Sequence, residues 1–97
     1  MTKKELIKKL DIYELSDKVS LNFYDNHFSN VPNIIGITYH NSHYVVYVNN
    51  DEGKHTILSQ PIHEEMACYS LYTYLTMYLQ SKQNKQEHVV QKVNRIK

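Results

Sequence analysis

The sequence predicts an α+β fold: a three-stranded, mostly antiparallel sheet packed by a long C-terminal helix, with a short N-terminal helix beside it. Two stretches rich in β-branched and aromatic residues, 34–40 and 43–49, are separated only by Asn41 and Ser42. A third stretch of this kind, 54–58, follows a turn that contains Gly53. Residues 61–79 then keep apolar residues at helical spacing with no glycine. These observations together indicate a hairpin, a further strand and a long helix.

The turn residues support this assignment. Asn41 tolerates the left-handed conformation that a tight hairpin turn needs, and Gly53 supplies a positive φ before the third strand. Gly36 lies inside the first strand, where a glycine marks either a bulge or the close approach of another backbone.

The predicted long helix has apolar residues on nearly all its sides. We expect it to begin at Pro61, with Glu64 and Glu65 in its first turn, where carboxylates stabilise the positive end of the helix dipole. One face consists of Cys68, Leu71, Tyr72, Leu75 and Leu79, and the opposite side of Ile62, Met66, Tyr69 and Met77. A helix of this kind needs two covers, so either the N-terminal segment or a partner covers the second side.

The N-terminal third has a clear helix followed by less regular sequence. Thr2 is followed three residues later by Glu5, as in a capping box, and predicts a helix over residues 3–10. Residues 19–23 alternate in a way that allows a short strand. Residues 24–33 are dense in Asn, Asp and Ser and predict an exposed loop, on which Phe28 either is displayed or tucks beneath.

Charge divides the chain into an acidic middle and two basic ends. The net charge is +1 over 97 residues, which argues against nucleic-acid binding by the whole domain. We expect residues 1–80 to form a single α+β domain. Residues 81–97 are polar and basic, and we predict either a helical extension or a flexible tail there.

No arrangement of residues predicts an enzyme, a cofactor or a metal site. The six histidines match no ligand spacing, and His63-Glu64 is followed by Ala67 where a metalloprotease helix needs a second histidine. Cys68 is the one cysteine, and burial on the apolar helix face would keep it inert. The N-terminus lacks an apolar run long enough for a signal peptide, and no membrane span is expected, so we expect a cytoplasmic protein.

Two short stretches resemble a known family. Tyr44 to Gly53 (YVVYVNNDEG) and Glu64 to Tyr69 (EEMACY) are similar to a strand, an acidic turn and a helix motif of the small immunity proteins of bacterial polymorphic-toxin systems. The chain resembles a divergent member, with His43-Tyr44 where that family usually has a tryptophan. The resemblance implies a non-enzymatic inhibitor that neutralises a cognate toxin by stoichiometric binding. The acidic middle suits a toxin with a basic active site.

The alternative is a phage-encoded counter-defence inhibitor of the anti-CRISPR type, which presents carboxylates as an acidic mimic of nucleic acid. For either function we predict partner contacts in the loop and in the acidic turn, through Tyr24, Asp25, His27, Phe28, Asp51 and Glu52. This choice requires the N-terminal segment to cover the second side of the long helix. If Met66 and Tyr69 are exposed, the contact surface is instead on that helix, where a second copy of the chain could also bind and form a homodimer.

Overall fold

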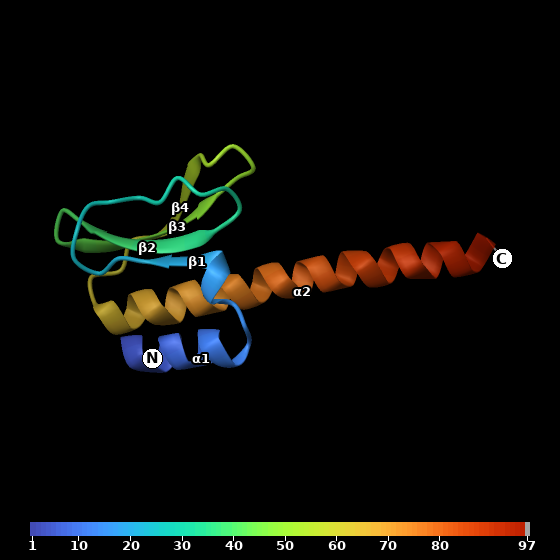
Figure 1. Ribbon diagram of the computed structural model, residues 1–97, viewed down its shortest axis with the longest axis horizontal. Coiled ribbons are helices and arrows are strands. Elements are labelled where there is room, and N and C mark those ends of the chain that lie inside the picture. Colours follow the sequence, from blue (N-terminus) through green and yellow to red (C-terminus); the bar gives the residue numbers. More distant parts are fainter. Residues whose placement is uncertain (97) are drawn as a thin grey trace.

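The computed structural model describes residues 1–96, with side chains described for residues 1–80 (Figure 1). The class is α+β and both predicted helices are present, but the sheet has four strands rather than three. The elements in chain order are α1 (Lys3–Ile12), a turn of 3₁₀ helix (Ser16–Lys18), β1 (Val19–Leu21), β2 (Ile35–His40), β3 (His43–Asn49), β4 (His55–Ser59) and α2 (Glu64–Ile96).

The strands follow the order β1-β2-β3-β4 across the sheet, and β1 is the strand that the prediction left open. It pairs parallel with β2, whereas β2–β3 and β3–β4 are antiparallel. A parallel pair needs a long connection, and residues 22–34 provide it. The predicted hairpin is confirmed: Asn41 and Ser42 form its turn with φ of 50° and 63°, as a type I′ turn requires.

Both helices lie on one face of the sheet, where they build the main core (Figure 1). Thr2 caps α1 as predicted, since its Oγ1 accepts a hydrogen bond from the Glu5 N–H at 3.1 Å. Leu6 and Leu10 of α1 and Cys68, Leu71 and Leu75 of α2 are buried together against β2 and β3. The predicted inner face of the long helix is therefore confirmed.

The connection between β1 and β2, called here the covering loop (residues 22–34), closes the opposite face of the sheet (Figure 1). The Phe28 ring lies beneath it, with its centroid 4.8 Å from that of Tyr47 and 4.9 Å from that of His55. The Ser29 N–H donates to the Tyr47 hydroxyl at 2.9 Å, and Asn49 Nδ2 donates to the Ser29 and Val31 carbonyls at 2.7 and 2.9 Å. The loop is exposed over most of residues 24–33, as predicted, and its inner side also covers the sheet, where side chains of β3 fix it.

Gly36 makes room for the ring of Tyr47. The two residues are paired across β2 and β3, and a Cβ built on Gly36 would lie 2.4 Å from Tyr47 Cζ. The sequence suggested a bulge at Gly36 or the approach of another backbone. The structure instead brings an aromatic side chain against it, and the register shift falls between Val46 and Tyr47 in the pairing with β4.

The helix α2 begins at Glu64, so the predicted start at Pro61 is wrong. The Pro61 carbonyl accepts a hydrogen bond from the Tyr44 N–H at 2.9 Å, which holds this residue outside the helix, and the His63 carbonyl accepts the Ala67 N–H at 3.1 Å. Glu64 and Glu65 do occupy the first turn. The bounds of α2 reach Ile96, and the predicted basic extension, residues 81–97, lies outside the residues whose side chains are described.

We predict that Gly36→Ala lowers the free energy of unfolding by about 1–3 kcal/mol, because the new methyl group must displace the buried Tyr47 ring. Urea unfolding measures the loss. In a Tyr47→Val background, where no ring lies over Gly36, the same substitution should cost clearly less; an equal cost in both backgrounds would contradict the proposed clash.

Candidate functional site

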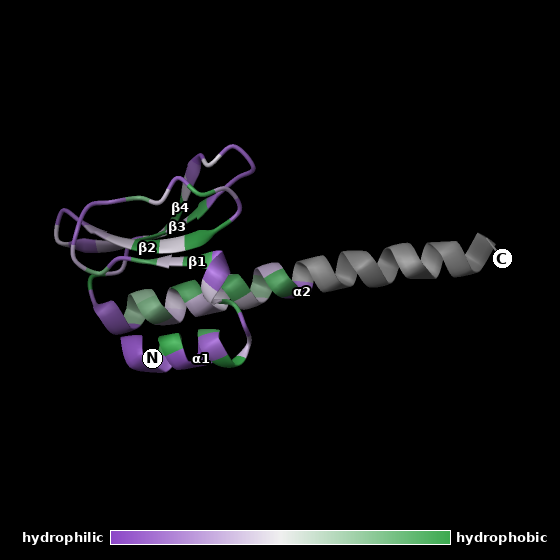
Figure 2. Ribbon diagram, viewed as in Figure 1, coloured by the Kyte–Doolittle hydropathy of each residue, from purple (hydrophilic) through white to green (hydrophobic). Residues whose placement is uncertain are grey.

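The side of α2 that faces away from the sheet presents large apolar side chains to solvent. Met66, Tyr69 and Met77 are 58%, 60% and 57% exposed, and Ile62, just before the helix, is 64% exposed. We call these four residues the α2 strip. Helix α1 does not reach the strip, because it packs along the flank of α2, where Lys9 Nζ lies 5.2 Å from the Tyr72 ring. Figure 2 shows apolar residues in the described part of α2 as well as in the strands.

A shallow groove separates the α2 strip from β4. Its volume is about 470 Å³, and it is lined by Ser59, Pro61, Met66, Tyr69, Ser70, Thr73, Tyr74 and Met77. Two contacts join β4 to α2 beside this groove. The hydroxyls of Ser59 and Ser70 are 2.6 Å apart, and the Tyr74 hydroxyl donates to the Leu58 carbonyl at 3.4 Å.

The strand β4 forms one edge of the sheet. It pairs with β3 on one side, and no described strand pairs with it on the other. Its sequence, HTILS, contains no lysine, carboxylate or proline, and Ile57 is 51% exposed. An uncharged edge with an exposed apolar residue is a template for pairing with another chain. The opposite edge, β1, is only three residues long.

The predicted contact residues of the covering loop have different environments. Tyr24 is 76% exposed and its hydroxyl accepts a hydrogen bond from Lys3 Nζ at 3.3 Å. Asp25 and His27 are also exposed, although the Asp25 carbonyl accepts from the Thr38 hydroxyl. Phe28 is half-buried beneath the loop, so of the two alternatives for this residue the structure shows the second.

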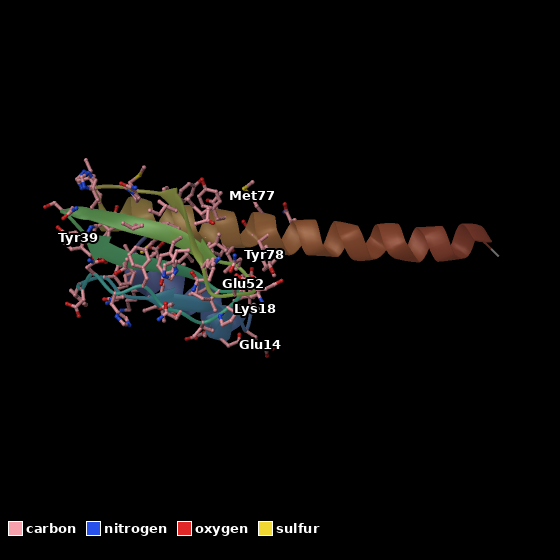
Figure 3. The ribbon with its side chains drawn as sticks, turned by 90° about the horizontal axis from the view of Figure 1, so that it is seen from above. Glu14, Lys18, Tyr39, Glu52, Met77 and Tyr78 are labelled. Atoms are coloured by element: carbon pink, nitrogen blue, oxygen red, sulfur yellow. The ribbon has the colours of Figure 1, made fainter. Side chains whose placement is uncertain are left out.

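Asp51 and Glu52 are exposed on the turn between β3 and β4, and Glu52 pairs with Lys54 at 3.4 Å. The structure does not bring this turn together with Asp25. The Asp25 carbonyl also accepts the Tyr39 N–H, near the C-terminal end of β2, whereas Gly53 of the turn packs against Asn30. Figure 3 shows Tyr39 and Glu52 at opposite ends of the sheet. The predicted residues therefore form two separate places rather than one site.

We placed the partner contacts in the loop and the acidic turn on the condition that the N-terminal segment covers Met66 and Tyr69. Both side chains are exposed, so this condition is not met. The candidate surface is instead the α2 strip together with the edge of β4. The second apolar side of the long helix was visible in the sequence, but the uncharged edge was not, because the predicted strand, 54–58, includes Lys54. No pattern in the sequence indicated that α1 packs along the flank of α2 and leaves the strip open.

A second hollow, of about 380 Å³, opens between the sheet and α2 near Leu75 and Tyr78. Its lining is mainly apolar, with Ile35 and Leu58 on the sheet side and Lys18 as its cationic residue. In Figure 3, Lys18 and Tyr78 lie at the end of the sheet beyond which α2 continues. The apolar lining and one lysine define no recognisable ligand chemistry.

Two titratable side chains of the described chain, Cys68 and Tyr44, have raised pKa values. Cys68 is fully buried, and burial raises the pKa of its thiol to about 11. Burial and the nearby Glu64 carboxylate also raise the pKa of Tyr44. His55 Nδ1 lies 2.6 Å from Asn49 Oδ1 and donates to it, because the Asn49 amide group already donates to the covering loop. Within residues 1–80, no group of three or more His, Cys, Asp or Glu side chains could hold a metal ion.

None of the described helices is both long enough and apolar enough to cross a membrane.

No protein-family model matches the chain, and no match was found among curated proteins or among solved structures. The fold and its surfaces are therefore the basis for the functional argument.

We predict that Cys68 in the folded protein reacts with iodoacetamide at pH 8 at least about 100-fold more slowly than a free thiol. A pKa of about 11 in place of 9.0 lowers the thiolate fraction by that factor, and burial limits access further. Mass spectrometry of timed samples measures the rate, with the protein in denaturant as the control. Equal rates in the folded and denatured protein would show that the thiol is accessible.

Proposed function

We propose that this protein is a non-enzymatic inhibitor that neutralises a cognate bacterial toxin by stoichiometric protein–protein binding. The observation that supports it best is the α2 strip, in which four large apolar side chains are each more than half exposed. Contiguous apolar surface of this kind marks a protein-interaction site, and methionine and tyrosine are enriched in the centres of interfaces.

The resemblance to immunity proteins is compatible with this proposal but does not carry it. Tyr44 to Gly53 forms β3 and its turn, and Glu64 to Tyr69 forms the first turns of α2. Ala67 and Cys68 are fully buried, so helix–sheet packing alone accounts for these two small residues. Tyr69, in contrast, is the last residue of the similar stretch and points to solvent, where packing does not require it.

The charges near the α2 strip favour a basic partner. Glu65 is exposed and Glu64 half-buried in the first turn of α2, beside Ile62 and Met66. Carboxylates at the rim of an apolar patch steer a positively charged surface toward it and fix its orientation. A toxin that binds nucleic acid would present such a surface.

The acidic mimic of the counter-defence alternative needs carboxylates in a row at phosphate spacing. Asp25 lies near one end of β2 and the turn with Asp51 and Glu52 near the other, so these three do not form such a row. The toxin inhibitor is therefore the better supported proposal.

The test is a pair of matched substitutions, Tyr69→Glu on the α2 strip and Tyr24→Glu on the covering loop. Both tyrosines are exposed, at 60% and 76%. In cells that express a candidate toxin encoded beside the gene for this chain, we expect the wild-type chain and Tyr24→Glu to restore growth. Tyr69→Glu should fail, with binding weakened at least about 30-fold, as for an interface hot spot.

The two variants should keep the wild-type circular dichroism spectrum, since both changes are at the surface. Failure of the wild-type chain to restore growth or to co-purify with the toxin would refute the proposed function. Loss of protection by Tyr24→Glu alone would leave the function in place and return the contact to the covering loop.

A further inference from the structure

We propose that two copies of this chain pair antiparallel along β4, which joins their four-stranded sheets into one. This goes beyond the proposed function, because it concerns a contact of the protein with itself.

The edge of β4 is suited to accept a strand. Its outer side has no described partner, and the strand lacks the lysine, the proline and the inward-pointing charge by which proteins usually protect a sheet edge. Ile57, at its centre, is 51% exposed. An added strand would satisfy the free backbone groups of this edge and bury the isoleucine.

The strand is also complementary to itself. It has five residues, so an antiparallel pair about its centre places Ile57 opposite its own counterpart, Thr56 opposite Leu58, and His55 opposite Ser59. No carboxylate or lysine meets a like charge in this register, and β-branched and apolar residues occupy the three central pairs. The two-fold symmetry that homodimers favour needs a surface of this kind.

The groove beside β4 is not on the axis of this pair. β4 is joined to α2 at Leu58–Tyr74 and Ser59–Ser70, which are contacts of the C-terminal end of the strand. A two-fold axis through Ile57, at the middle of β4, therefore lies beyond Tyr74 toward Tyr78 rather than at the middle of the α2 strip.

The dimer rests on the edge of β4 and on Ile57. Ile57 is paired with Tyr47 and so lies on the face of the sheet that the covering loop closes, whereas α2 lies on the other face. The contact is therefore smaller than the roughly 800 Å² per partner of a standard interface, and we expect weak pairing. The dimer leaves the α2 strip exposed, so self-association and toxin binding use different surfaces.

The experiment combines mass in solution with substitutions at Ile57. By sedimentation velocity at concentrations up to about 100 μM, a range that detects micromolar pairing, we expect a species of twice the 11.5 kDa chain mass. Ile57→Lys sets two ammonium groups opposite each other and should weaken the dimer at least tenfold. Val31→Lys is the control, since Val31 is similarly exposed, at 56%, but lies on the covering loop.

A second variant tests the register directly. Ile57→Cys places two thiols opposite each other at the two-fold axis, within the range that a disulfide spans, and should form covalent dimers under mild oxidation. Val31→Cys should form few. The native Cys68 is buried and does not compete.

The proposal is overturned if the wild-type protein is a monomer across this range, if Ile57→Lys leaves the dimer unchanged, or if Ile57→Cys forms covalent dimers no faster than Val31→Cys. A monomer that still co-purifies with the toxin would overturn this inference and leave the proposed function intact. Far-ultraviolet circular dichroism checks that each variant is folded.

Discussion

The packing of Tyr47 against Gly36 is the contact on which the rest of the structure depends. Tyr47 is fully buried, its ring occupies the space that a side chain at position 36 would need, and its hydroxyl accepts the Ser29 N–H. Phe28 then packs on the same ring. These contacts bring the covering loop onto the second face of the sheet, where Asn49 fixes it with two further hydrogen bonds.

Closing that face determines which surfaces remain for binding. The covering loop occupies one face of the sheet, and α1 and α2 occupy the other. Within the described chain, the outer side of α2 and the edge of β4 together carry five of the large apolar side chains that are more than half exposed, and others lie near the end of α1 and on the covering loop. Glutamates flank the outer side of α2 at the start of the helix. The surface that we propose for binding is therefore built from regular elements, which hold it more rigidly than a loop would.

The elements that could be predicted from the sequence are those set by local interactions. The Asn41-Ser42 turn and the Thr2 cap involve neighbours along the chain, and both are present as expected. The strand β1 was left open because three residues give little pattern and their partner in β2 is 16 positions away, as Val19 pairs with Ile35. The start of α2 was misplaced because the Tyr44 N–H takes the Pro61 carbonyl, a tertiary contact that no helix signal reveals.

The same division between local contacts, which could be predicted, and long-range contacts, which could not, applies to the candidate site. The apolar side of the long helix was apparent from its spacing, but the choice between it and the loop depended on where α1 packs. The contacts that turn the loop into a cover join residues 18 and 20 positions apart, Ser29 with Tyr47 and Asn49 with Ser29. For this reason we assigned Phe28 and the acidic turn to a partner. The structure shows that Phe28 instead packs against Tyr47 within the chain.

Hydrogen–deuterium exchange at low and at high protein concentration tests most directly the claim that binding uses β4 and the outer side of α2. The account predicts that exchange at residues 55–59 slows as concentration rises, because pairing occupies the free edge, while the covering loop is unchanged. Slowing in the covering loop or in the turn at Asp51 and Glu52, with no change in β4, would contradict it.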